Sequence, residues 1–293
     1  MNIRKLLMAL ACILCVAVSS VAQDEINPTI VASMNKLDYK PKVKKNSVGE
    51  VIGEVAVAVL AGQTSKEMLG YENAVRAAIV QGMSNAYRLK VVDGLTEEDL
   101  EYPYVIYVDG DITNMTTTNK TEVETYEVKG EKKTRSRTYF RGQIAVTLQL
   151  KDAHDGSVVA SPSFNITESD VSWIETAEGA MNKALEALSK KVRMCFNNIF
   201  PLTGSIIERA GIKNDKQKEV YIDLGSANGL SEGVVLQVFR SKIVAGRTAK
   251  QEIARLRVKD VEGEDVSLCK VTSHAKDLKA ALDAGETLII ETK

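Results

Sequence analysis

A polar segment over residues 113–138 constrains the fold more than any other part of the chain. It is rich in threonine among alternating charges, and Lys129-Gly130-Glu131-Lys132-Lys133 is typical of a turn. A period of two indicates β-strands, so we predict two long polar strands joined by a protruding hairpin. The return strand, residues 139–150, carries an apolar face: Ile144, Val146, Leu148 and Leu150.

The residues around this hairpin predict an α/β (α+β) sandwich domain over 49–200. Residues 51–60 are nearly continuous apolar and rich in valine, which indicates a central strand covered on both faces. Apolar and small residues recur at helical spacing over 66–87, and a second helix over 175–200 ends at Pro201. Shorter strands are expected at 89–92, at 104–112 and, after the Asp155-Gly156 turn, at 158–166.

Residues 201–293 predict a small all-β barrel domain with a short helix over 275–282. Glycines mark its best local motif: a strand ends at Gly225, a turn passes through Gly229, and Gly233 opens the next strand. We expect these glycines to supply positive φ angles. The short β-like runs lie at 203–208, 219–224, 233–240, 252–261, 264–272 and 287–291.

The N-terminal residues 1–22 have the pattern of a secretory signal peptide. A basic start precedes an apolar run, and small residues before Gln23 predict cleavage between Ala22 and Gln23. The run is shorter than a bilayer span, so we expect an exported periplasmic chain that could associate with the outer membrane. Lipidation at Cys12 or Cys15 is the rival interpretation, but the residues after each cysteine stay apolar, as in the middle of a signal peptide. Residues 23–48 are expected to form a loosely packed polar leader.

Processing would leave two cysteines, Cys195 and Cys269, in an oxidising compartment. Two interpretations stay open: a disulfide between them, or two buried thiols in separate domains. The spacing has no Cys-x-x-Cys pair, which argues against a redox site or a structural zinc.

The search for reaction chemistry gives no catalytic, metal or cofactor site. The two histidines, His154 and His274, lie in polar segments and are expected on the surface. Glycines 225–233 lack the Gly-Lys-Ser/Thr ending of a phosphate loop. The 38 basic and 39 acidic residues nearly cancel, which argues against nucleic-acid binding.

One concentrated basic stretch offers a candidate partner surface. Facing glutamates could balance it as a solvated ribbon, or it could dock an acidic partner or an anionic envelope polymer. Trp173 is either an anchor for a partner or part of the packing where the following helix starts. The basic residues are Lys129, Lys132, Lys133, Arg135, Arg137 and Arg141, and the glutamates are Glu122, Glu124, Glu127 and Glu131.

The order of predicted elements over 51–200 resembles the domain shared by the curli secretion lipoprotein CsgG, the penicillin-binding-protein activator LpoB and the middle part of the flagellar assembly protein FlgT. The motif from Ile222-Asp223-Leu224-Gly225 to Gly233 resembles the C-terminal barrel of FlgT-like proteins. This resemblance implies an envelope protein without catalysis that binds partners or assembles into a ring.

The hairpin departs from that of the CsgG pore, because a strand that spans a membrane needs an apolar face. We therefore expect an adaptor or assembly subunit rather than a pore, with an envelope protein or a second copy of the chain as partner. A module that binds glycan or peptidoglycan through the barrel is the alternative, and a hydrolase with an unrecognised carboxylate site is a lesser one. One face of 114–124 reads Asn114, Thr116, Thr118, Lys120, Glu122 and Glu124, and the other reads Met115, Thr117, Asn119, Thr121 and Val123.

Overall fold

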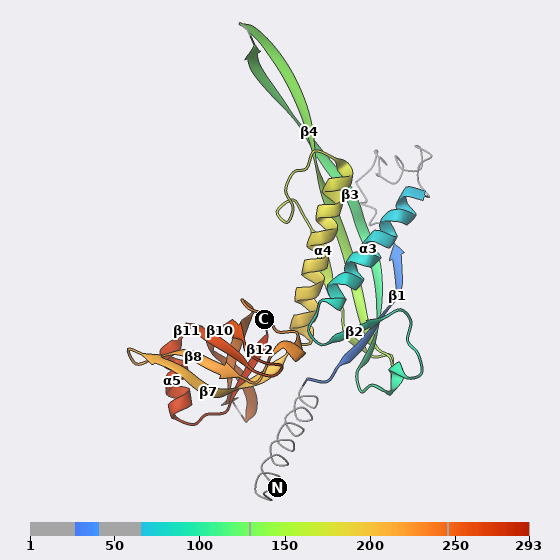
Figure 1. Cartoon of the computed structure of the whole chain (residues 1–293). Coiled ribbons are helices and arrows are strands. Elements are labelled where there is room, and N and C mark those ends of the chain that lie inside the picture. Colours follow the sequence, from blue (N-terminus) through green and yellow to red (C-terminus); the bar gives the residue numbers. More distant parts are fainter. Residues whose placement is uncertain (1–26, 41–65, 129, 245, 293) are drawn as a thin grey trace, which may run out of the picture. The chain divides into compact units, whose positions relative to one another are not determined.

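The computed structural model describes residues 27–40 and 66–292, except 129 and 245, and the side chains only from residue 72 on in the second range (Figure 1). The described residues divide into two compact units, one over Ile30–Cys195 and one over Phe196 onward together with residues 27–29. The predicted signal peptide, its cleavage site at Ala22 and Gln23, the predicted strand over 51–60 and Lys129 lie outside the described residues.

The first unit is a mixed sheet with helices. Its strands run in the order β2-β1-β3-β4-β5, and β6 also pairs with β4. Strand β1 is parallel to both β2 and β3, whereas the other pairs are antiparallel. The elements are β1 (Ile30–Tyr39), α3 (Lys66–Ser84), β2 (Leu89–Val92), the short 3-10 helix η1 (Asp99–Glu101), β3 (Val105–Val128), β4 (Glu131–Asp152), β5 (Val158–Ala160), β6 (Ser163–Ile166) and α4 (Ala177–Ile199).

Helices α3 and α4 pack against one face of this sheet (Figure 1). Every second residue of β4 from Ile144 to Leu150 is at most 1% exposed, which confirms the apolar face predicted for the return strand. Two glycines, which carry no side chain, allow β4 and α3 to pack closely against α4. A Cβ on Gly142 of β4 would lie 2.6 Å from the Ala180 carbonyl oxygen of α4, and one on Gly82 of α3 would lie 2.6 Å from the Ser189 carbonyl oxygen.

The prediction of a loosely packed leader over 23–48 is wrong for residues 30–39. These residues form β1, and its first five residues are buried between two parallel neighbours. Lys40 follows β1 and pairs with Asp111 of β3 at 2.7 Å. Only five apolar or small residues precede the polar end of β1, so the apolar run that could indicate a strand in the sequence is short. The neighbours that stabilise it lie about 60 to 75 positions further along the chain.

Asp99 is a buried carboxylate at the start of η1, and its side chain is well partnered. It accepts hydrogen bonds from the hydroxyl (2.8 Å) and the amide (3.2 Å) of Thr96, and it pairs with Lys90 at 3.2 Å. Because these contacts stabilise the ionised form, the hydrogen bonds from Thr96 first and Lys90 next, the pKa of Asp99 lies below its ordinary value.

The second unit is a closed six-stranded barrel in the order β10-β11-β8-β7-β12-β9, as expected for a small all-β domain. Asn27 joins its wall, because its amide donates to the Thr203 carbonyl (2.7 Å) and accepts from the Thr203 amide (2.8 Å). The elements are β7 (Thr203–Lys213), β8 (Lys216–Ile222), the 3-10 helix η2 (Ser226–Asn228), β9 (Val235–Val244), β10 (Arg247–Val261), β11 (Ser267–Ser273), α5 (Ala275–Asp283) and β12 (Leu288–Thr292).

Glycine is required in this motif for two different physical reasons, rather than only for the positive φ angles that we predicted. Gly229 (φ 72°) and Gly233 (φ 84°) adopt the positive φ that glycine tolerates best. Gly225 is extended, with φ at −146°. It is needed because a Cβ there would lie 2.5 Å from the backbone of Gly263 and Glu264.

Candidate functional site

The long hairpin is the most exposed feature of the first unit, and its outer part is a two-stranded ribbon. Residues 116–128 of β3 pair with 131–143 of β4, from Thr116 opposite Gln143 to Val128 opposite Glu131. We call these residues the ribbon. The other strands pair with β3 only up to Ile112 and with β4 only from Ile144, and residues 121–128 and 131–136 are exposed, so the outer part of the ribbon is open on both faces (Figure 1).

The turn of the ribbon is tighter than the five-residue turn we predicted. Strand β4 already begins at Glu131, and Gly130 takes a φ of 81°. A short turn fixes the register, and the register decides which side chains share a face.

The two faces of the ribbon differ in chemistry. One, the charged face, gathers both signs of charge and two tyrosines, whereas the other, the threonine face, is mostly neutral. The charged face carries Lys120, Glu122, Glu124, Tyr126, Glu131, Lys133, Arg135, Arg137, Tyr139 and Arg141, and the threonine face carries Thr117, Asn119, Thr121, Val123, Thr125, Glu127, Lys132, Thr134, Ser136, Thr138 and Phe140.

The register divides the predicted basic stretch between these faces. Lys133, Arg135, Arg137 and Arg141 share the charged face, whereas Lys132 lies on the threonine face opposite Glu127. Three of the predicted glutamates do face basic residues: Glu122 lies opposite Arg137, Glu124 opposite Arg135, and Glu127 opposite Lys132. Glu131 is on the same strand as the basic residues and faces Val128. Opposite charges at facing positions favour this register by about 0.2 to 1 kcal/mol each.

Trp173 lies at the base of the charged face, between two cations. The Lys120 ammonium is 4.8 Å from the centre of its ring and the Arg141 guanidinium carbon is 4.3 Å away. The Lys120 ammonium is also 5.7 Å from the ring of Tyr139. Cation–π contacts of this kind contribute about 0.5 to 2 kcal/mol, more as water is excluded. Neither role that we considered for Trp173 describes this arrangement, in which the ring packs under the ribbon's own side chains.

A backbone bridge holds Trp173 in place. The amide of Phe140 donates to the Ile174 carbonyl (2.7 Å), and the amide of Ile174 donates to the Phe140 carbonyl (2.9 Å). The segment before α4 thus joins β4 for one residue pair, which brings residues more than 30 positions apart together. The sequence holds no local signal for this bridge, so the cluster of Lys120, Arg141 and Trp173 was missed.

Two arginines of the charged face keep a donor without a partner. Within the described residues, Nε of Arg137 and Nε of Arg141 are shielded from water and make no hydrogen bond. Hydrogen bonding to Tyr139, and then the carboxylates of Glu124 and Glu175, raise the pKa of the Arg137 guanidinium. Arg141 approaches Glu168 at 3.5 Å. Because these Nε atoms are shielded, an external ligand does not reach them.

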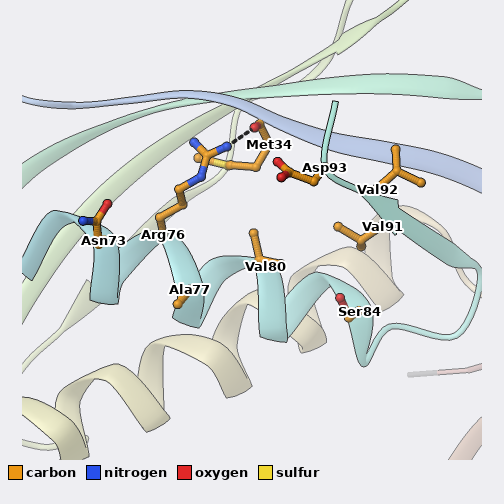
Figure 2. Close-up of a pocket in the computed structure, with 9 residues that line it drawn as sticks. All are labelled: Met34, Asn73, Arg76, Ala77, Val80, Ser84, Val91, Val92 and Asp93. Atoms are coloured by element: carbon orange, nitrogen blue, oxygen red, sulfur yellow. Dashed lines mark hydrogen bonds between the residues drawn. The ribbon is translucent and has the colours of Figure 1, made fainter. Parts of the chain in front are cut away.

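The hollow under α3 is the other concave feature of the first unit. It has a volume of about 380 Å³, and Arg76 reaches across it to the Met34 carbonyl (Figure 2). The ladder between β1 and β3 shifts after Met34, and Arg76 also donates to the Asn35 carbonyl at 3.3 Å. Arg76 therefore caps carbonyls at a bulge, which is a structural role.

The remaining predicted residues are dispersed. Cys195 on α4 and Cys269 on β11 are free thiols and belong to different units. Burial raises the pKa of Cys269 to about 12 and raises that of Cys195 as well. His154 and His274 are exposed, as predicted. Across the part of the chain that the structure describes, no three His, Cys, Asp or Glu side chains gather as a metal site.

No helix among the described residues has both the length and the hydropathy to cross a bilayer.

No family model and no curated protein matches the chain. Among solved structures, the chain is similar to a neuraminyllactose-binding hemagglutinin homolog from Helicobacter pylori, with 12% identity over 59% of this chain and 84% of that one and a TM-score of 0.30. It is also similar to the hypothetical protein CT253 from Chlamydia trachomatis, with 11% identity over 58% of this chain and 98% of that one and a TM-score of 0.29. We base no argument on similarities at this level.

Proposed function

We propose that the chain is a non-catalytic adaptor or assembly subunit of a cell-envelope complex, exported to the periplasm, that docks its partner on the charged face of the ribbon. The assignment of the first unit to the CsgG type and of the barrel to the FlgT type belongs to this proposal and rests on the sequence resemblance.

The observation that carries the proposal is the ribbon itself. The outer part of the ribbon is open on both faces and contributes no core, and two-stranded ribbons are only marginally stable alone. The cluster around Trp173 stiffens the base on one face, so that face is held in a fixed shape where a partner would meet it. Pre-ordered side chains reduce the entropy that binding costs.

The chemistry of the charged face indicates an acidic partner. Lys133 faces Tyr126 and has no acidic residue directly opposite, whereas Arg141 approaches Glu168. Arginine guanidinium groups bind carboxylate and phosphate groups well, so the arginines of the charged face favour a partner that presents such groups. The only charged residues of the threonine face are Glu127 and Lys132, which lie opposite each other, so this face is a control surface within the same element.

Photo-crosslinking in cells tests this proposal. A benzoylphenylalanine replaces Tyr126 on the charged face (42% exposed) or Val123 on the threonine face (66% exposed). We expect an adduct with a defined protein, or with a second copy of the chain, from position 126 and not from position 123. The double variant K133E/R135E should abolish this adduct, whereas K216E/K218E on exposed positions of β8 should leave it intact.

Two outcomes would overturn the proposal. The first is a chain that remains monomeric with no adduct from position 126. The second is retention on purified cell-wall polymer that is unaffected by K133E/R135E and lost on disrupting the barrel, which would establish the glycan-binding alternative instead.

A further inference from the structure

A second, shorter hairpin projects from the barrel. Residues 241–244 of β9 pair with 247–250 of β10, from Ser241 opposite Lys250 to Val244 opposite Arg247. Strand β12 pairs with β9 only up to Arg240, and β11 pairs with β10 only from Arg255. These residues, which we call the barrel hairpin, therefore have no other strand beside them.

The end of the barrel hairpin exposes apolar side chains to an unusual degree. Ile243 is 75% exposed and Val244 is 52% exposed. Successive residues of a strand point to opposite faces, so these two side chains point away from each other. A flat partner placed on one face would cover only one of them. The side chains of Ile243 and Val244 are covered together only when the end of the hairpin inserts into a medium that deforms around it.

The charge around this end has one sign. Residues 240–251 contain four basic residues and no acidic residue. Arg240 pairs with Glu286, and Lys250 pairs with Glu291. Lys242 and Arg247, which flank the apolar end, form no ion pair with any residue that the structure describes. The hollow beside the hairpin, about 470 Å³ in volume, is lined by Arg240 and Lys242 and by one carboxylate, that of Glu286.

We infer that the barrel hairpin binds the surface of an anionic lipid membrane, with Ile243 and Val244 entering the interface and Lys242 and Arg247 at the headgroups. Apolar side chains next to basic ones are the combination that binds anionic interfaces. At about 3.3 Å per residue, Lys250 lies about 10 Å from Arg247, so all four basic residues lie near the headgroups. This inference does not depend on the proposed function of the ribbon.

Vesicle sedimentation of the full chain tests the inference. The vesicles contain phosphatidylcholine with about 30% phosphatidylglycerol, or phosphatidylcholine alone. We expect K242Q/R247Q to weaken binding to the anionic vesicles about 25-fold, at about five-fold per basic residue. We expect I243S/V244S to weaken it about ten-fold. The control I207S/I212S removes two side chains of β7 that are 53% and 54% exposed, and should bind like wild type.

A local measurement separates the barrel hairpin from any other part of the chain that binds lipid. A tryptophan at position 243 should be quenched by brominated lipid in anionic vesicles and released by high salt, whereas one at position 207 should not. The inference is overturned if I243S/V244S and K242Q/R247Q bind like wild type, if position 243 is not quenched, or if the variants instead lose a protein crosslink without any change on vesicles.

Discussion

Replacing Gly225 by alanine should open the barrel, because the added methyl group meets backbone rather than flexible side chains. The new Cβ would lie 2.5 Å from the carbonyl oxygen of Gly263 and from two backbone atoms of Glu264. Those carbonyls already accept hydrogen bonds from the amides of Ser226 (3.0 Å) and Ala227 (2.9 Å). The loop cannot move away without weakening these bonds.

The size of the effect follows from these contacts. Overpacking costs about 1 to 3 kcal/mol, and each weakened hydrogen bond adds about 0.5 to 1.5 kcal/mol. We therefore expect a loss of about 2 to 6 kcal/mol in the free energy of opening the barrel. This corresponds to an opening equilibrium that is about 30-fold to 25,000-fold more favourable.

Cys269 provides the assay. Its side chain is fully buried in the barrel, and its raised pKa keeps it unreactive until the barrel opens. Alkylation of Cys269, followed by peptide mass spectrometry to separate it from other cysteines, reports this opening. Gly263→Ala is the matched control, because its Cβ would meet nothing closer than 3.9 Å. Equal alkylation rates at Cys269 in Gly225→Ala and Gly263→Ala would refute the reasoning.

Three further predictions address other contacts. In a series of urea unfolding curves, Asp99→Asn should reduce the loss of stability that the first unit shows below about pH 4. The pKa of Asp99 is lowered in the folded state. Wild type therefore has this stabilisation above the ordinary pKa of 3.8 and loses it as the pH falls through the folded-state pKa. A variant with the same acid dependence as wild type would contradict this. Trp173→Leu should speed hydrogen exchange of the Phe140 amide about 5-fold to 30-fold, since about 1 to 2 kcal/mol of cation–π contact is lost, whereas Tyr126→Leu should leave it unchanged. Asn27→Ala removes two hydrogen bonds to the barrel and should raise the alkylation rate of Cys269 about 5-fold to 30-fold; an unchanged rate would show that these bonds contribute nothing.

The ribbon shows how much of the structure the periodicity of the sequence can predict by itself. Alternation over 113–150 was enough to predict the hairpin, because strands that face water on both sides depend little on distant residues. The predicted turn of five residues was too long, and this changed which charges share a face. The register alone places Lys120 on the charged face and Lys132 on the threonine face.

The barrel and the closing helix were predicted for the same reason. Their apolar periods and glycine turns are local, so α4 and the six strands of the barrel appear near their expected positions, although β7, β9 and β10 extend further than predicted. The cause assigned to Gly225 was wrong, since its need for a small side chain comes from a loop about 40 positions away.

The sequence by itself determined the elements whose stability is local: the polar ribbon, the amphipathic helices and the turns at Gly229 and Gly233. Tertiary structure alone decided that residues 30–39 are a strand whose first five residues are buried, since parallel pairing joins residues distant in the chain. It also placed Trp173 between Lys120 and Arg141 through one backbone bridge. Local periodicity records which way a side chain faces, whereas a site also depends on which distant residue faces it.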